Sequence, residues 1–184
     1  MILITGATGK IGSRLTKKLL DAGEKVRVVS RDEEKLEGFT EQGADSAVGD
    51  LLDSDFCRSA FEGCNRAFLL VQGSPTNGRH QEEELQIGRN YAEAMKAAGL
   101  KHALFISSLG AEKGTGSPII DVKLEIEKEL KETGIPVTVI RPGNFMENMY
   151  NFMETISSAG FFTYPMAGNV RMPHVSVDDI AEVS

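Results

Sequence analysis

The segment GATGKIG, residues 6–12, stands between a short apolar run and the first helical pattern of the chain. In such a segment Gly6 allows a tight turn, Gly9 lets the backbone approach a pyrophosphate, and Gly12 lets the helix pack closely on a sheet. The free N–H groups and the dipole of the helix favour a phosphate charge, so we expect this unit to bind a dinucleotide. The motif residues expected to contact the cofactor are Gly6, Thr8, Gly9, Lys10, Ile11 and Gly12.

Beyond this segment the chain repeats the alternation of strand and helix, with short connections. Such alternation predicts a parallel sheet covered by helices on both faces. We expect one α/β domain over residues 1–184, a doubly wound Rossmann fold with three α/β/α layers. The predicted strands are 2–5, 26–30, 46–50, 67–72, 102–108 and 136–142, and the predicted helices are 14–23, 32–43, 53–62, 80–98 and 119–130.

The last residues, VDDIAEVS (177–184), resemble the first turns of a helix. Asp178 is the expected N-cap, with apolar Ile180 and Val183 behind it. Natural domains rarely end inside a helix opening, so we expect a further C-terminal segment that contributes to substrate binding.

Composition narrows the class of protein. The 184 residues are 41% hydrophobic and 26% charged, which suits a globular domain with a core. A net charge of −7 without a basic run argues against nucleic acid as the main partner. No apolar run reaches the roughly 18 residues of a membrane span. Cys57 and Cys64 have no metal-ligand spacing, so we expect no metal site and reduced thiols in a cytoplasmic protein.

The glycine spacing G-x-x-G-x-x-G, with the serine pair 107–108 ending a predicted strand, resembles the short-chain dehydrogenase/reductase superfamily. The segments RPGNFMEN (141–148) and VSVDDIAEV (175–183) resemble its atypical, NmrA-like branch. The resemblance runs along the whole chain. That branch includes quinone oxidoreductases and sensor proteins, so the resemblance implies either reduction with a nicotinamide cofactor or sensing of that cofactor.

The choice of cofactor depends on the end of the second predicted strand, SRDE (30–33). An arginine there would meet the 2′-phosphate of NADP, whereas an acidic residue would bind the ribose hydroxyls of NAD. Arg31 comes first after the strand, at the position that resembles the phosphate reader of the relatives. Asp32 could serve the ribose or cap the next helix. We expect NADP(H), with NAD(H) as the alternative.

Open α/β sheets bind ligands at the carboxyl ends of their strands. The resemblance implies that Asp50 accepts from the adenine amino group with Leu51 beside it, and that the segment after the sixth strand packs beside the nicotinamide. The alternatives are a loop carboxylate for Asp50 and a core residue for Phe145. The other residues expected at this edge are Leu70, Val71 and Gln72 after the fourth strand, and Pro142, Gly143, Asn144 and Phe145 after the sixth.

Members of the superfamily commonly use a tyrosine to move a proton, a lysine four residues later, and a serine that polarises the carbonyl. No tyrosine in this chain is followed by lysine at that spacing. In the helix predicted over 119–130, Lys123 matches the lysine and Ile119 stands at the tyrosine position. The tyrosines of the chain are Tyr91, Tyr150 and Tyr164.

Lys123 interrupts an apolar arc predicted for this helix. The resemblance implies that its ammonium holds the nicotinamide ribose. The alternative is an i,i+4 ion pair with Glu127, worth a few tenths of a kcal/mol. The residues of the arc are Ile119, Val122, Ile126 and Leu130.

Ser107 and Ser108 join Lys123 as catalytic candidates. One of them would polarise a carbonyl or touch the nicotinamide, and the other would cap the strand end. Phe145 and Tyr150 are the candidates for the wall of a substrate pocket.

The chain has the full set of predicted cofactor-binding motifs but lacks the usual catalytic tyrosine. This combination predicts an NADP-dependent oxidoreductase. It would pass a hydride directly to a small quinone-like or conjugated carbonyl compound, because a quinone needs no tyrosine to polarise it. The alternative is a non-catalytic redox sensor that binds NADP(H) and a protein partner. A nucleotide-sugar epimerase or dehydratase is a third hypothesis, which the absent tyrosine disfavours. Assembly as a homodimer or with a protein partner is a further expectation.

Overall fold

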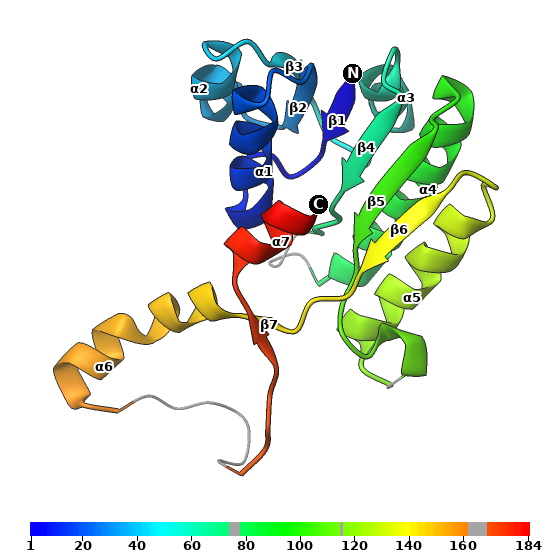
Figure 1. The fold of residues 1–184 in the computed structure, drawn as a ribbon. Helices are drawn as coiled ribbons and strands as arrows, with labels where there is room; N and C mark the ends of the chain where they lie inside the picture. The colour runs from blue at the N-terminus through cyan, green and yellow to red at the C-terminus, as the bar shows by residue number, and fades with distance from the viewer. Residues whose placement is uncertain (74–77, 115, 162–168) are drawn as a thin grey trace.

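The computed structural model describes residues 1–73, 78–114, 116–161 and 169–184 (Figure 1). Six strands pair in parallel in the order β3-β2-β1-β4-β5-β6. This is the order of a dinucleotide-binding doubly wound sheet, so the predicted fold class is confirmed. The strands are β1 (Ile2–Ile4), β2 (Val26–Ser30), β3 (Asp45–Val48), β4 (Arg66–Leu69), β5 (His102–Ile106) and β6 (Val137–Ile140).

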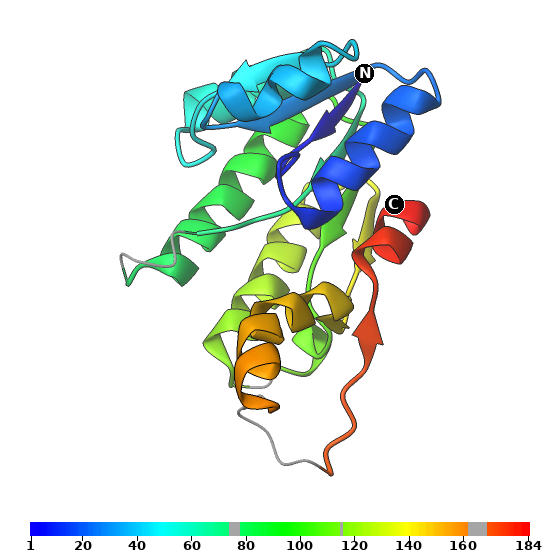
Figure 2. The same ribbon diagram turned by 90° about the vertical axis from the view of Figure 1, so that its left-hand side faces the viewer.

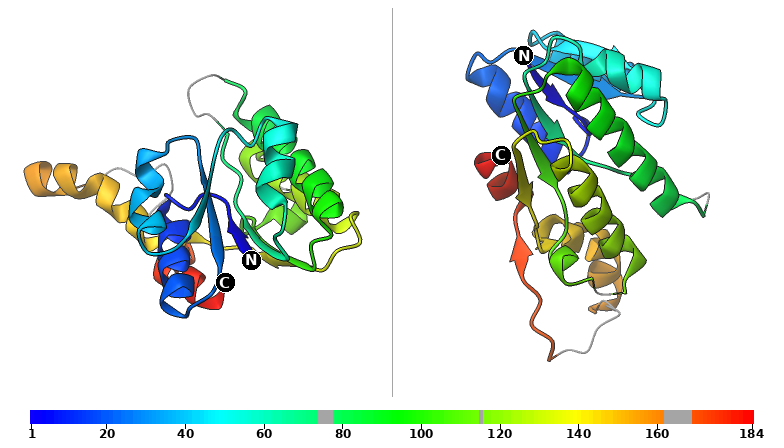
Figure 3. Two further views of the ribbon diagram at one scale, coloured as in Figure 1. Left: turned by 90° about the horizontal axis from the view of Figure 1, so that it is seen from above. Right: turned by 90° about the vertical axis from the view of Figure 1, so that its right-hand side faces the viewer.

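Helices cover both faces of the sheet, as Figure 2 and Figure 3 show. On one face α1 and α7 pack against side chains such as Ile4 and Leu104. On the other face α3, α4 and α5 pack against the alternate side chains, such as Leu3 and Phe105. The helices are α1 (Lys10–Asp21), α2 (Glu37–Thr40), α3 (Ser54–Phe61), α4 (His80–Ala98), α5 (Pro118–Lys131), α6 (Met153–Ala159) and α7 (Val177–Val183).

Short elements complete the described chain. The strands β7 (Asn144–Phe145) and β8 (His174–Val175) form a separate parallel pair. From β7 the chain continues through η3 and α6, which project away from the sheet (Figure 1). The 3₁₀ turns are η1 (Glu34–Leu36), η2 (Ala111–Lys113) and η3 (Met146–Phe152).

Two predicted helix features differ from the structure. The helix expected over 32–43 is only a 3₁₀ turn followed by the four-residue α2. The N-cap of α7 is Ser176, not Asp178, because the Ser176 hydroxyl accepts from the Asp178 N–H at 3.1 Å. The Asp178 carboxylate instead forms an ion pair with Arg14 of α1. This pair ties α7 to the first helix.

The strands end earlier than the apolar runs predict, and this shapes the edge of the sheet. β4 ends at Leu69 and β5 ends at Ile106. The residues that follow these two strands therefore have irregular backbone, and their side chains can line a cleft at this edge.

Within the described segments, no helix has both the length and the apolar character needed to cross a bilayer. Cys57 and Cys64 are both buried and free, so the predicted reduced thiols fit the structure. Burial raises the pKa of the Cys57 thiol to about 12, which keeps it protonated and unreactive.

Candidate cofactor and catalytic site

Two pockets adjoin at the carboxyl edge of the sheet. The first has a volume of about 200 Å³ and reaches the ends of β2 and β3. The second, about 610 Å³, reaches β5, α5 and the segment after β6. The residues shared by both pockets are Gly6, Thr8, Leu70 and Gln72. One elongated ligand can therefore run through both, across the glycine turn.

At Gly6 and Gly12 the glycine turn has no room or no suitable backbone angle for a side chain, and at Gly9 the room is tight. Gly6 has φ of +66°, which an L side chain rarely adopts. A Cβ on Gly12 would lie 2.2 Å from the Gly6 carbonyl oxygen, and one on Gly9 would lie 3.2 Å from the same atom. No side chain caps the start of α1. Its first N–H groups are thus available to an anion, and the cradle fits the diphosphate of a dinucleotide.

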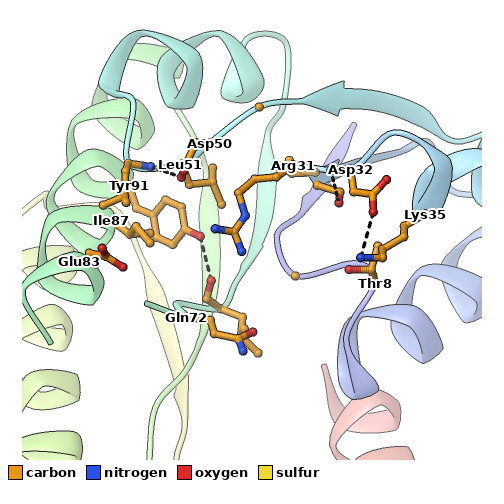
Figure 4. Close-up of a pocket in the computed structure, with 16 residues that line it drawn as sticks. Thr8, Arg31, Asp32, Lys35, Asp50, Leu51, Gln72, Glu83, Ile87 and Tyr91 are labelled. Carbon is orange, nitrogen blue, oxygen red and sulfur yellow. Dashed lines mark hydrogen bonds and ion pairs between the residues drawn. The ribbon is translucent and has the colours of Figure 1, made fainter. Parts of the chain in front are cut away.

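Charged side chains surround the far end of the first pocket (Figure 4). Arg31 extends into it, while the Asp32 carboxylate lies 3.0 Å from the Lys35 ammonium in an ion pair. The hydrogen bond from Lys35 lowers the pKa of Asp32, so this carboxylate is ionised and offset by a cation. Asp50 also lines the pocket and accepts from the Leu52 N–H at 3.0 Å.

The sequence did not predict the contribution of α4 to this pocket. Ile87 and Tyr91 line it from the side that faces β4. Tyr91 is fully buried, and its hydroxyl donates to the Leu70 carbonyl at 2.9 Å. Their spacing of one helical turn is the signal that places both side chains on one face of the helix.

The second pocket brings together the predicted catalytic candidates Ser107 and Lys123 and the predicted pocket-wall residue Phe145. Lys123 is only 13% exposed, and its Nζ donates to the Glu84 carboxylate of α4 at 2.7 Å. The ion pair with Glu127 that was the alternative for Lys123 is therefore wrong. Burial lowers the pKa of Lys123, and the nearby Glu84 opposes that effect.

Glu127 is instead the centre of a separate buried network. Its carboxylate accepts from the Ser107 hydroxyl at 2.6 Å and from Arg141 at 2.9 and 2.6 Å. Burial alone would raise the pKa of Glu127, but the hydrogen bonds from Arg141 and Ser107 bring it below its usual value. The single hydroxyl proton of Ser107 is thus engaged, and its lone pairs remain for a ligand.

Several predicted site residues lie outside the lining of both pockets: Ser108, Pro142, Gly143, Asn144 and Tyr150. Tyr150 is 72% exposed on η3. A Cβ on Gly143 would lie 2.4 Å from the Pro173 carbonyl oxygen. A glycine at this position therefore lets the backbone at residue 143 pass close to the backbone at Pro173. From the same segment Asn148, which was not predicted, lines the second pocket and accepts from Lys10 at 3.3 Å.

Ile119 departs from its expected place in the apolar arc. It is 62% exposed in the first turn of α5, whereas Val122, Ile126 and Leu130 are buried as predicted. The residue at the tyrosine position therefore lies in solvent and outside the pocket lining.

Several known proteins are similar to this chain in sequence. The chain is 28% identical to an NAD(P)H azoreductase of Xenophilus azovorans, over the whole chain and 62% of that protein. It is 32% identical to quinone oxidoreductase 2 of Escherichia coli strain K12, over 80% of the chain and 50% of that protein.

A solved structure of an NADPH-dependent quinone oxidoreductase from Escherichia coli, in complex with NADPH, has the same fold. Its TM-score is 0.76 at 29% identity, covering 88% of this chain and 56% of that one. The chain thus spans less than two thirds of the length of each of these relatives. The sequence model of the NmrA-like family matches residues 1–184. The chain belongs to the NmrA-like family.

Proposed function

We propose that this chain binds NADPH and belongs to an oxidoreductase that passes a hydride to a quinone-like or other flat conjugated carbonyl compound. The observation that carries the proposal is the lining of the second pocket. Lys123 and Ser107 both line it, together with the glycines of the 6–12 turn. No tyrosine lines this pocket among the described residues. The quinone and azo reductases among the relatives support a substrate that needs no tyrosine to polarise it.

Two cations favour NADPH over NADH. Arg31 and Lys35 both line the first pocket, where the 2′-phosphate of adenosine would lie. Asp32, which lines the same pocket beside them, is paired with Lys35. The charge of Asp32 is therefore partly offset, which makes this carboxylate a weaker acceptor for the ribose hydroxyls of NAD.

The bound cofactor would supply a hydride from its nicotinamide ring. The chain itself supplies an ammonium at Lys123 and a hydroxyl acceptor at Ser107, on one wall of the pocket. Ile106 and Phe145 add apolar surface that excludes water from the reacting atoms. One Lys123 proton is held by Glu84, so two remain for ligand oxygens.

NADPH oxidation measured against a panel of substituted quinones tests the function. We expect turnover by the wild-type protein and a loss of tenfold or more in kcat/KM for Lys123→Met, since one charge-assisted contact is worth about 1.5–3 kcal/mol. Lys128→Met is the matched control, because Lys128 lies exposed on the same helix. Cofactor binding at micromolar concentration without turnover of any quinone would overturn the catalytic proposal.

One observation favours a second candidate, a sensor of NADP(H). The ammonium of Lys123 is balanced by Glu84, and the proton of Ser107 is engaged by Glu127. The Lys123 ammonium and the Ser107 hydroxyl are therefore poorly placed to give a proton to a substrate in this structure. A sensor would bind NADP⁺ and NADPH with different affinities and retain a protein partner in only one of these states, which titration and co-purification would measure.

A further inference from the structure

A buried ion pair joins α4 to α5 behind the second pocket. The Glu84 side chain is 4% exposed and the Lys123 side chain 13% exposed, with 2.7 Å between carboxylate and ammonium. A buried pair of charges seldom stabilises a protein more than apolar packing of the same volume. The pair therefore calls for a role besides holding the two helices together.

A second ion pair between the same two helices provides the contrast. Arg89 of α4 and Glu129 of α5 lie 3.4 Å apart, with 52% and 37% of their side chains exposed. Neither residue lines either pocket. An exposed pair of this kind holds helices weakly and has no effect on a buried ligand.

Glu84 is the carboxylate that neutralises the charge of Lys123. The other carboxylate on this face of α5, Glu127, is engaged by Ser107 and Arg141. The second oxygen of Glu84 has no hydrogen-bond partner among the described residues. His80, one turn earlier on α4, has its Nε2 3.5 Å from the first oxygen of Glu84.

We propose that Glu84 is the positioning residue of this site. It keeps Lys123 protonated in a buried place and holds the ammonium against the pocket wall, where a bound ligand meets it. The part of this inference that concerns turnover rests on the proposed function. The part that concerns cofactor affinity rests on NADPH binding alone and not on turnover, because Lys123 lines the pocket beside the glycine turn in either case.

Removing the Glu84 charge should make Lys123 easier to deprotonate. In Glu84→Gln the size of the side chain is kept, but the buried ammonium loses the charge that stabilises it. NADPH affinity, measured by fluorescence between about pH 6 and 9, should then begin to fall about one pH unit or more lower than in the wild type. Near the acidic limit, where Lys123 is protonated again, affinity should recover to within a few-fold of wild type.

Glu129→Gln is the matched control, since it removes the carboxylate of the exposed pair between the same helices. We expect its pH profile to coincide with that of the wild type. If Glu84→Gln also coincides with the wild type, or loses affinity equally at every pH, the positioning role is wrong.

A double-mutant cycle separates positioning from packing. Because Glu84 is proposed to act only through Lys123, Glu84→Gln should not weaken NADPH binding further in a Lys123→Met background. Additive losses would overturn the proposal. Should Glu84→Gln fail to fold, Glu84→Asp keeps the charge but withdraws it from Lys123. Because the ammonium then loses part of the charge that stabilises it, NADPH affinity should again begin to fall at a lower pH than in the wild type, and a wild-type pH profile would contradict the inference.

The outcomes also separate this inference from the proposed function. A wild-type protein that turns over no quinone refutes the catalytic proposal alone. An affinity profile that is unchanged in Glu84→Gln refutes the positioning role alone.

Discussion

Ser107 donates its hydroxyl proton to Glu127 over 2.6 Å, at the point where the chain leaves β5 beneath α5. Both residues are buried, and Arg141 completes the network from the end of β6. A hydroxyl whose proton is engaged by a carboxylate can only accept from a ligand. This geometry favours a contact between Ser107 and the nicotinamide amide over polarisation of a substrate carbonyl.

The same network predicts how stability depends on pH. Hydrogen bonds from Arg141 and Ser107 hold the pKa of Glu127 below its usual value despite burial. The folded protein therefore binds this proton less readily than the unfolded chain does. Its contribution to stability is present above the usual pKa of about 4.5 and is lost as the pH falls through the lower folded value.

Urea unfolding at a series of pH values checks this expectation. Glu127→Gln should be less stable near neutral pH, by about 1–3 kcal/mol, and should lose less stability on acidification than the wild type. Glu125→Gln, at an exposed position of the same helix, should follow the wild type. Equal acid sensitivity of Glu127→Gln and the wild type would contradict the role given to this network.

Gly12→Ala should damage the cofactor cradle. The added Cβ would lie 2.2 Å from the Gly6 carbonyl oxygen, so the turn or α1 must move. We expect a loss of about 1–3 kcal/mol in unfolding free energy and at least a tenfold loss in NADPH affinity. Gly38→Ala is the control, because nothing lies within 4 Å of its Cβ. Normal NADPH binding by Gly12→Ala would show that the cradle does not hold the diphosphate.

Arg31→Ala tests which nicotinamide cofactor the protein prefers. Because its guanidinium can bind a 2′-phosphate with charge-assisted hydrogen bonds, NADPH affinity should fall about tenfold or more while NADH affinity changes little. Fluorescence titration with both reduced cofactors measures the two effects. Arg58→Ala, an exposed arginine of α3 outside both pockets, should leave both affinities unchanged. Parallel losses for NADPH and NADH would rule out a phosphate reader at Arg31.

The sequence was sufficient for the fold because its signals are local. Strand and helix periods, the glycine turn and the short connections all predict a doubly wound parallel sheet, and its strand order agrees. The helix over 32–43 was wrong because a single buried side chain, Leu36, anchors this segment in place of a continuous apolar face.

Within the site, sequence reasoning named residues of the glycine turn and of strand ends that line the two pockets, although Ser108, Pro142, Gly143 and Asn144 line neither. It did not find Glu84, which meets Lys123 from a helix 39 residues away in the chain. The local pattern offered Glu127 as the nearest partner of Lys123, but the Glu127 carboxylate is bound by Arg141 instead. Pairing of buried charges depends on how helices are placed over a sheet, which a spacing rule within one helix cannot reveal.

The segment after β6 predicts a kinetic effect on cofactor release. Lys10, at the start of α1, donates to the Asn148 side chain at 3.3 Å, and Asn148 donates to Asn144 at 3.1 Å. Lys10 and Asn148 both line the second pocket, so this contact joins α1 to η3 within the pocket lining. A ligand that leaves the pocket between these two side chains must break the contact.

Asn148→Ala should therefore release NADPH several-fold faster. Its effect on thermal stability should be small, because the contact to Lys10 is exposed and such hydrogen bonds contribute only about 0.5–1.5 kcal/mol. Stopped-flow displacement of bound NADPH by excess NADP⁺ measures the dissociation rate. Asn151→Ala is the matched control, since Asn151 is exposed on the same 3₁₀ turn and outside both pockets. Equal dissociation rates for the two variants would show that the contact between Lys10 and Asn148 does not retain the cofactor.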